Sequence, residues 1–319
     1  MSANLDFARA HLGEVQAAAE RVKPHIRRTP ALATDLDPRL VLKAECFQVT
    51  GSFKARGAFN AVLKLPAGTA GVVTASSGNH AQAVALAART AGLKALILIP
   101  EGANPTKVAA TKALGAEVVS DGITFANRDQ KLEEAVAESG YTLIHPYDDW
   151  DVIHGQGTGA LELLEDAPDL DLVAVPVGGG GQLSGWAIAI KATRPEVRVI
   201  GVEPAAADDA FRSFQSGTLQ RLDAPPDTIA DGVKTLSIGR RNFETLIQNR
   251  LMDDIVTVTE AEIEQALLTA WLRCKLALEP TGALSLAAFL AGNLPEANRI
   301  GLLLSGGNAD PGLVVRLLQ

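Results

Sequence analysis

The sequence predicts an α/β protein with two lobes, each an open, mostly parallel sheet flanked by helices. Short apolar runs alternate with longer amphipathic runs, which is the pattern of strands and helices that follow one another. The chain has 319 residues, more than one hydrophobic core usually serves. It is 47% hydrophobic but only 4% aromatic, which suits buried parallel strands made of Ala, Val, Leu and Ile.

The alternating runs fall into two series separated by about thirty residues. The first series predicts strands at 71–75, 95–99 and 117–119, with helices at 79–91, 105–114 and 125–139. The second predicts strands at 172–177, 197–202 and 300–304, with helices at 182–194 and 311–318. A helical pattern at 1–22, a strand at 41–45 and a surface loop at 217–231 complete the assignment. We therefore expect a small mobile domain at 71–147 and a large domain formed by 1–70 plus 148–319.

Charge and cysteine content restrict the classes of partner and the cell compartment. The formal net charge of −8 disfavours nucleic acid and anionic membranes, which select basic surfaces. No uninterrupted apolar run reaches membrane-spanning length, and the N-terminus lacks an apolar signal core. Cys46 and Cys274 lie far apart without C-x-x-C spacing, which argues against a disulfide framework. We expect a cytoplasmic protein.

Four consecutive glycines, Gly178 to Gly181, separate the predicted strand at 172–177 from the helix that follows it. Bare backbone at a helix N-terminus offers several N–H groups to one anion, so the run predicts a phosphate-binding loop. It does not match the dinucleotide fingerprint G-x-G-x-x-G, and the sequence contains no Gly-Lys pair for a P-loop. A nucleotide-binding oxidoreductase is therefore a weak alternative.

Three other polar segments also follow predicted strands, where the ligands of parallel sheets collect. They are the segment around Lys54, the loop from Ser76 to His80, and the turn at Ser305. Each has a simpler interpretation: a solvated lysine, a helix N-cap and a tight turn. Only the glycine run favours a functional role by itself, because ordering four glycines is entropically unfavourable.

Taken together, the four segments resemble those of the fold-type II pyridoxal-phosphate (PLP) enzymes, both in their order along the chain and in their residues. These enzymes have the fold of the tryptophan synthase β chain, and the resemblance is to their threonine/serine dehydratase and serine racemase family. It runs from about residue 26 to the C-terminus. The further matching segments are Ile26 to Pro30, Lys43 to Glu45, Phe47-Gln48, Pro105 to Lys107, Gly115 to Val118, His145-Pro146, Gly155 to Thr158, Ile229 to Gly232 and Glu279 to Gly282.

The resemblance implies a role for each matching residue. Lys54 corresponds to the catalytic lysine, which binds PLP covalently and then moves the Cα proton of the substrate. The cofactor-binding residues implied with it are Phe53 on a ring face, Asn79 at the ring hydroxyl, Gly178, Gly179, Gly180 and Gly181 at the phosphate, Gly232, Glu279, and Ser305 at the pyridine nitrogen. The substrate carboxylate is assigned to Ser76, Ser77, Asn79 and His80.

The resemblance also implies the reaction. A neutral hydroxyl at the pyridine nitrogen makes a weaker electron sink than a carboxylate would, which favours loss of a β-substituent. We therefore expect deaminating dehydration of L-threonine and L-serine to 2-oxobutyrate and pyruvate plus ammonia. Serine racemase with side elimination activity is an alternative, because racemases carry a second acid/base hydroxyl at the position of Ser77. 3-Hydroxyaspartate dehydratase and a non-catalytic small-molecule-binding protein on the same scaffold are others.

An acidic segment after the strand at 197–202 resembles a divalent-metal loop of the racemases. The Glu203 and Asp209 carboxylates and the Ala207 carbonyl would supply hard oxygen ligands for Mg²⁺ or Ca²⁺. The alternative is a solvated helix start with favourable N-terminal carboxylates. Relatives imply a homodimer or homotetramer. The sequence identifies neither the oligomeric interface nor the preferred amino-acid substrate.

Overall fold

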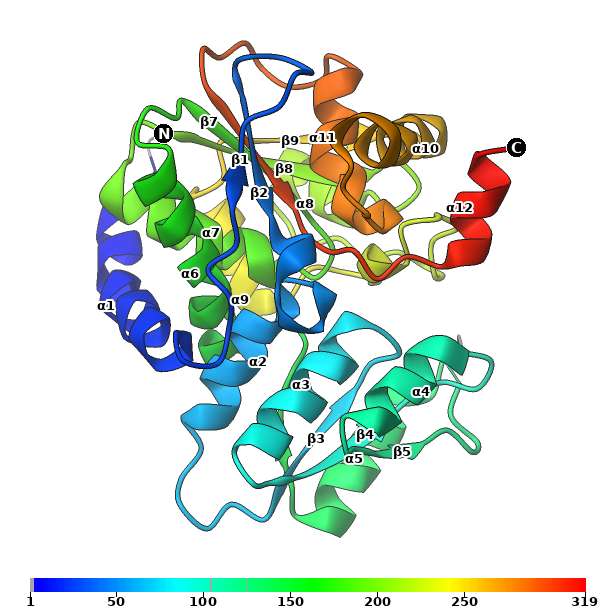
Figure 1. Cartoon of the computed structure of the whole chain (residues 1–319). Helices are drawn as coiled ribbons and strands as arrows, with labels where there is room; N and C mark the ends of the chain where they lie inside the picture. Colours follow the sequence, from blue (N-terminus) through cyan, green and yellow to red (C-terminus); the bar gives the residue numbers. More distant parts are fainter. Residues whose placement is uncertain (1–2, 104, 125) are drawn as a thin grey trace.

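The computed structural model describes residues 3–103, 105–124 and 126–319. Its strands form two sheets. In Figure 1 the larger sheet lies in the upper part of the view and the smaller sheet in the lower part. The larger sheet has six strands in the order β1-β2-β10-β7-β8-β9, parallel except for the antiparallel pair β1 and β2. These strands are β1 (Ala31–Leu32), β2 (Leu40–Ala44), β7 (Leu172–Pro176), β8 (Arg198–Pro204), β9 (Asp254–Val258) and β10 (Ile300–Leu304).

The smaller sheet has four parallel strands in the order β5-β4-β3-β6. They are β3 (Gly71–Ala75), β4 (Lys94–Leu98), β5 (Glu117–Val119) and β6 (Thr142–Leu143). One face packs on α2 (Lys54–Leu63), α3 (Asn79–Thr90) and α4 (Pro105–Ala113), and the other on α5 (Arg128–Ser139). An α/β layering with helices on both faces is therefore present in this part of the chain.

The central strands of the larger sheet are buried on both faces. In β7, Val173 and Val175 join the core beneath α1 (Leu5–Val22), α6 (Trp150–Asp166), α7 (Gly181–Thr193) and α8 (Asp209–Ser216). The alternate residues Leu172 and Ala174 join the core beneath α10 (Glu260–Thr269) and α11 (Leu284–Leu290). Successive side chains of β7 point to opposite faces of the sheet and enter two different cores. This explains why the sequence of β7 is continuously apolar. Figure 1 shows α1, α6 and α7 on one side of this sheet and α10 and α11 on the other.

The remaining elements are short and lie mostly in the connections. They are α9 (Arg240–Phe243), α12 (Pro311–Leu317), the 3₁₀ turns η1 (Glu45–Phe47), η2 (Val49–Gly51), η3 (Asp231–Val233) and η6 (Pro280–Ala283), and the π-helical turns η4 (Glu244–Gln248) and η5 (Ala270–Cys274). Cys46 and Cys274 are free. Across the described ranges, no helix is both long and apolar enough to cross a bilayer.

The predicted fold class is confirmed, and most predicted elements end within two residues of their observed bounds. The strand predicted at 300–304 coincides with β10, and the helix predicted at 79–91 is α3. The helix predicted from Phe125 begins at Arg128; Phe125 itself, like Met1 of the N-terminal pattern, lies outside the described residues. Strands β1, β6 and β9 and helices α6, α10 and α11 were not predicted.

Candidate active site

A cavity of about 820 Å³ is lined by residues that follow strands of both sheets. Its walls come from the segments after β3, β4, β6, β7 and β10, so the carboxyl ends of parallel strands meet there. The predicted site residues among its lining are Phe53, Lys54, Ser76, Ser77, Asn79, His80, Gly179, Gly232, Glu279 and Ser305. Gly178, Gly180 and Gly181 flank Gly179 without lining the cavity, and Glu203, Ala207 and Asp209 are not part of its lining.

Lys54 is positioned by a tight turn that joins it to the end of β10. Thr50 and Gly51 take left-handed φ values of 61° and 75°, and α2 then begins at Lys54. The amide of Phe53 donates to the carbonyl of Ser305 at 3.1 Å. The turn therefore brings two segments separated by most of the sequence to one corner of the cavity.

The Lys54 ammonium is surrounded by protein although part of its side chain is accessible from the cavity. Its Nζ donates to the carbonyl of Pro146 at 2.8 Å. Burial lowers the pKa of Lys54 from 10.5 to about 8, opposed by the charge of Glu279. Roughly a tenth of the amine is then unprotonated at pH 7, against less than about a thousandth at the ordinary value. Lys54 is therefore suited to nucleophilic use.

Glu279 and Asn79 form a hydrogen-bonded pair beside Lys54. Asn79 Nδ2 donates to Glu279 Oε1 at 2.6 Å. Burial, and then the charge of Asp231, raise the pKa of Glu279 to about 7, against the opposing effects of Lys107, Asn79 and Lys54. A carboxyl group with a pKa near 7 can exchange a proton near neutral pH.

The glycine loop is packed so closely that side chains are excluded. A Cβ atom at Gly179 would lie 2.2 Å from the Tyr147 ring, and one at Gly181 would lie 2.7 Å from the Tyr147 carbonyl. The Gly179 carbonyl accepts hydrogen bonds from Asn242 Nδ2 at 2.7 Å and from the Gly239 amide at 3.0 Å. The carbonyl side of the loop is thus engaged, while Gly181 opens α7 with N–H groups that have no acceptor within the helix.

His80 is held as a neutral ring at the start of α3. Its Nε2 lies 3.0 Å from the carbonyl of Ile144 and therefore donates to it. Burial, followed by the charge of Lys54, lowers the pKa of His80 to about 3. Its buried Nδ1 has no hydrogen-bond partner in the part of the chain that the structure describes. In this arrangement Nδ1 is an acceptor, so His80 does not supply a positive charge for a substrate carboxylate.

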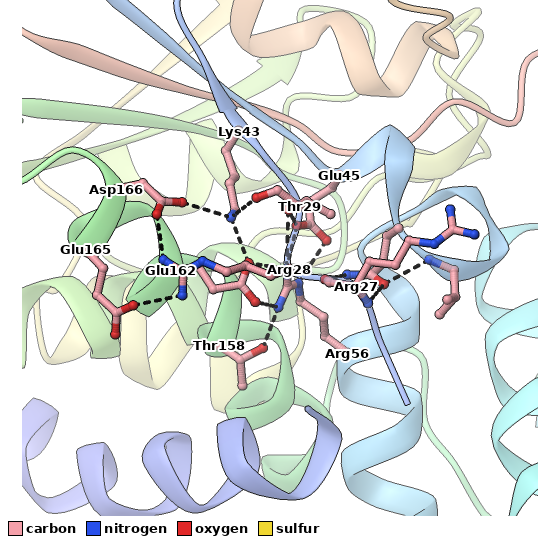
Figure 2. Close-up of polar contacts among 12 residues, drawn as sticks. Arg27, Arg28, Thr29, Lys43, Glu45, Arg56, Thr158, Glu162, Glu165 and Asp166 are labelled. Atoms are coloured by element: carbon pink, nitrogen blue, oxygen red, sulfur yellow. Dashed lines mark hydrogen bonds and ion pairs between the residues drawn. The ribbon is translucent and has the colours of Figure 1, made fainter. Parts of the chain in front are cut away.

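A buried ionic cluster fixes the helix that carries Lys54. Arg56, two residues farther along α2, donates through Nε and Nη2 to both carboxylate oxygens of Glu45 at 2.9 and 2.8 Å. It also donates to both oxygens of Glu162 at 2.8 Å, and Lys43 Nζ donates to Glu162 at 2.7 Å. Figure 2 shows these side chains meeting between α2, β2 and α6. Arg56 and Lys43 share Glu162, and Lys43 also lies 3.9 Å from Asp166, so the cluster ties the first turn of α2 to β2 and α6.

Residues 22–306 match the family model described as pyridoxal-phosphate dependent enzyme. The chain belongs to this family of PLP-dependent enzymes. It is 42% identical to serine racemase of Arabidopsis thaliana over 98% of this chain and 97% of the relative. It is also 42% identical to L-threo-3-hydroxyaspartate ammonia-lyase of Saccharomyces cerevisiae, over 93% of each. Among solved structures, a threonine deaminase of T.th. matches with a TM-score of 0.89 and 49% identity, over 94% of this chain and 98% of that one.

The residues of the cavity fit PLP. The glycine loop leaves no room for side chains and presents the N-terminus of α7, as a phosphate group requires. Lys54 offers an amine with a lowered pKa, and Asn79 and Ser305 line the same cavity. The buried hydroxyl of Thr235, also in the lining, has no hydrogen-bond partner among the described residues. The cavity thus holds an amine, unpaired polar groups and a bare-backbone loop for one aldehyde-bearing phosphate ester.

The predicted metal ligands lie together outside the cavity lining. Glu203 is in β8, Asp209 opens α8, and Ala207 lies in the turn between them. Burial raises the pKa of Asp209 to about 7 against the opposing backbone amide of Ile238, and its buried oxygens lack a hydrogen bond of good geometry. Burial and Asp209 raise the pKa of Glu203. No cluster of three or more His, Cys, Asp or Glu side chains arranged for a metal ion occurs in the described part of the chain.

The cavity also contains charged and aromatic residues that were given no role from the sequence. They include Lys107, Arg128, His145, Tyr147, Asp231 and Lys234. Lys107 forms an ion pair with Asp231, which connects α4 to η3. Lys107, His145 and Asp231 lie in segments that match the PLP-enzyme family in sequence, and this match could have identified them as site residues. Arg128, at the start of α5, lies in no such segment.

Proposed function

We propose that the protein deaminates L-threonine and L-serine by PLP-dependent dehydration, giving 2-oxobutyrate or pyruvate plus ammonia. The observation that carries the proposal is the cavity that Lys54, Asn79, Gly179 of the glycine loop and Ser305 share. The 49% identity to a threonine deaminase over 94% of this chain supports it. The neutral Ser305 hydroxyl supports elimination, because it does not stabilise a protonated pyridine nitrogen as a carboxylate would.

When bound, PLP supplies an electron sink for the bond broken at the substrate Cα. The protein supplies proton transfer and orientation. We assign removal and return of the substrate Cα proton to the Lys54 amine. Its pKa near 8 lets it accept and donate a proton near neutral pH. The loop from Ser76 to His80, at the N-terminus of α3, would receive the substrate carboxylate.

We also propose that residues 71–147 form a small domain that closes over the substrate. The four-stranded sheet and its loop from Ser76 to His80 belong to this segment. The ion pair of Lys107 with Asp231 connects α4 of this segment with η3 of the remainder of the chain. Closure would bring the loop onto the carboxylate and exclude water.

A substrate panel tests the proposed reaction. The PLP-loaded protein is incubated with L-threonine, L-serine, D-serine and L-threo-3-hydroxyaspartate, with 2-oxo acid and chiral readouts. We expect 2-oxobutyrate from L-threonine and pyruvate from L-serine. Absence of both 2-oxo acids would refute the proposed dehydration, and oxaloacetate alone would assign the chain to the 3-hydroxyaspartate lyases.

A second candidate is serine racemase with side elimination activity. It is favoured by Ser77, which lines the cavity, and by the 42% identity to a plant serine racemase. If Ser77 is the second acid/base, Ser77→Ala should lower D-serine formation from L-serine by at least ~10²-fold while pyruvate formation persists. Chiral chromatography of the same reaction measures both. Wild-type protein that forms no D-serine would end this candidate.

We propose further that Glu203, Asp209 and the Ala207 carbonyl bind Mg²⁺ or Ca²⁺. Two buried carboxylates close enough to repel are stabilised by a divalent cation. Saturating Mg²⁺ or Ca²⁺ should raise the thermal midpoint of the holoenzyme by about 2 °C or more, and Asp209→Asn should abolish the increase. Asp208→Asn is the matched control, since Asp208 pairs with Arg212. An equal increase in Asp209→Asn would contradict the assignment.

A further inference from the structure

Asn308 joins three segments that lie far apart in the sequence. It follows β10 and Ser305 in the loop that borders the cavity. Its Nδ2 lies 2.7 Å from the carbonyl oxygen of Thr50 and 2.8 Å from Asn79 Oδ1. One side-chain amide thus connects the turn before Lys54, the start of α3 and the end of β10.

The chemistry of these contacts fixes the orientation of both amides. The carbonyl of Thr50 only accepts hydrogen bonds, so the Asn308 atom that contacts it is the NH₂ group. That group also contacts Asn79, so the facing Asn79 atom is its oxygen. The NH₂ group of Asn79 therefore points the other way, and it donates to Glu279 Oε1 at 2.6 Å. The Thr50 carbonyl therefore determines which atoms donate and which accept in the hydrogen bonds of Asn308 and then of Asn79.

This order leaves Asn79 with a defined role toward a bound cofactor. Its oxygen is occupied by Asn308, and one N–H is directed to Glu279. Its second N–H remains for a ligand in the cavity that Asn79 lines. With the amide turned around, the oxygen would face the Glu279 carboxyl group and no N–H would face the ligand.

The surrounding backbone is built to place Asn308. A Cβ atom at Gly51 would lie 2.4 Å from Asn308 Oδ1, so only glycine leaves room for this side chain. Gly51 has a φ of 75°, which other residues rarely adopt, and its carbonyl accepts from the Gly307 amide at 2.9 Å. The isolated bridge between Ser52 and Gly306 continues the same contact.

We propose that Asn308 is a positioning residue that fixes the Asn79 amide with its NH₂ group toward Glu279 and the ring hydroxyl of PLP. The inference rests on the proposed placement of the cofactor beside Asn79. A hydrogen bond donated to the ring oxygen stabilises its deprotonated form, so it lowers the pKa of that oxygen. Asn308 thereby sets the pH at which the lysine-bound cofactor changes its absorption spectrum.

The test is a spectroscopic pH titration of holoenzyme carrying Asn308→Asp. A carboxylate of the same shape cannot donate to Thr50 or Asn79, so the Asn79 amide loses its fixed orientation. We expect the spectral midpoint to move up by about one pH unit and the dissociation constant for PLP to rise about tenfold. Asn308→Ala removes the donor without adding charge, so it should shift the spectral midpoint and the dissociation constant for PLP in the same direction. It replaces Asn308→Asp in the test if that variant does not fold.

Two controls separate positioning from general damage. Asn293→Asp removes a surface amide that donates to the Thr257 carbonyl, and it should leave both values unchanged. In the Asn79→Ala background, Asn308→Ala, which adds no charge, should shift the midpoint no further, because its partner is already gone. Additive shifts, or a wild-type midpoint in Asn308→Asp, would overturn the inference. Wild-type protein that binds no PLP would instead refute the proposed function.

Discussion

Replacing Lys54 by alanine is expected to abolish 2-oxo acid formation. The variant loses the amine that binds PLP covalently and the base assigned to the Cα proton. Loss of the proton transfer alone should lower the reaction rate ~10²- to 10⁴-fold, and loss of the covalent link to PLP should lower it further. The absorbance of the lysine-bound cofactor should disappear as well. Absorption spectra and a coupled assay for 2-oxobutyrate measure both effects.

Lys112→Ala is the matched control, since Lys112 is an exposed lysine in the last turn of α4. It should retain the wild-type spectrum and rate. A Lys54→Ala protein that deaminates threonine at the wild-type rate would refute the role of Lys54.

Replacing Arg56 by methionine is expected to cause the largest loss of stability in this set. Methionine has a similar length but leaves Glu45 buried without its bidentate partner and Glu162 with Lys43 alone. Removing one partner of a buried ion pair lowers the free energy of unfolding by about 3–5 kcal/mol. Urea unfolding of the holoenzyme measures the change. Arg56→Lys keeps the charge but loses the paired geometry, so it should be intermediate.

Arg9→Met tests whether the loss is specific to burial. Arg9 pairs with Asp6 at 3.5 Å on the surface, with both side chains more than half exposed. Such a pair contributes about 1 kcal/mol or less. If Arg56→Met is no more destabilised than Arg9→Met, the buried cluster does not hold α2 as described.

The fold class could be predicted because both sheets consist of buried parallel strands. β7 reads as a continuous apolar run since its alternate residues enter two different cores. The edge strands β1 and β6 have only two residues each, too few for a periodic pattern. Helix α6 contains Gly155, Gly157 and Gly159, which hide a helix in the sequence. The structure explains Gly155 and Gly157, where a Cβ atom would lie 2.6 Å from backbone oxygens of α2 and α7.

The sequence supplied candidate site residues on separate segments, and the structure brings ten of them to one cavity but through contacts that the sequence did not predict. Glycine content identified the loop at Gly179, and the resemblance identified Lys54 and Glu279. The lowered pKa of Lys54 depends on burial beside Pro146, which is 92 residues away. The order of hydrogen bonds from Thr50 through Asn308 to Asn79 likewise depends on three loops that meet only in the fold. Such properties depend on tertiary contacts that local patterns do not encode.

Chemical trapping of the bound cofactor identifies the lysine that carries PLP. Three lysines among the described lining residues face the cavity, Lys54, Lys107 and Lys234. The holoenzyme is reduced with borohydride, which makes the link between lysine and PLP permanent, and is then digested and mapped by mass spectrometry. We predict the phosphopyridoxyl group on Lys54, because burial favours its unprotonated amine. A group on Lys107 or Lys234 instead, or no modified lysine, would contradict it.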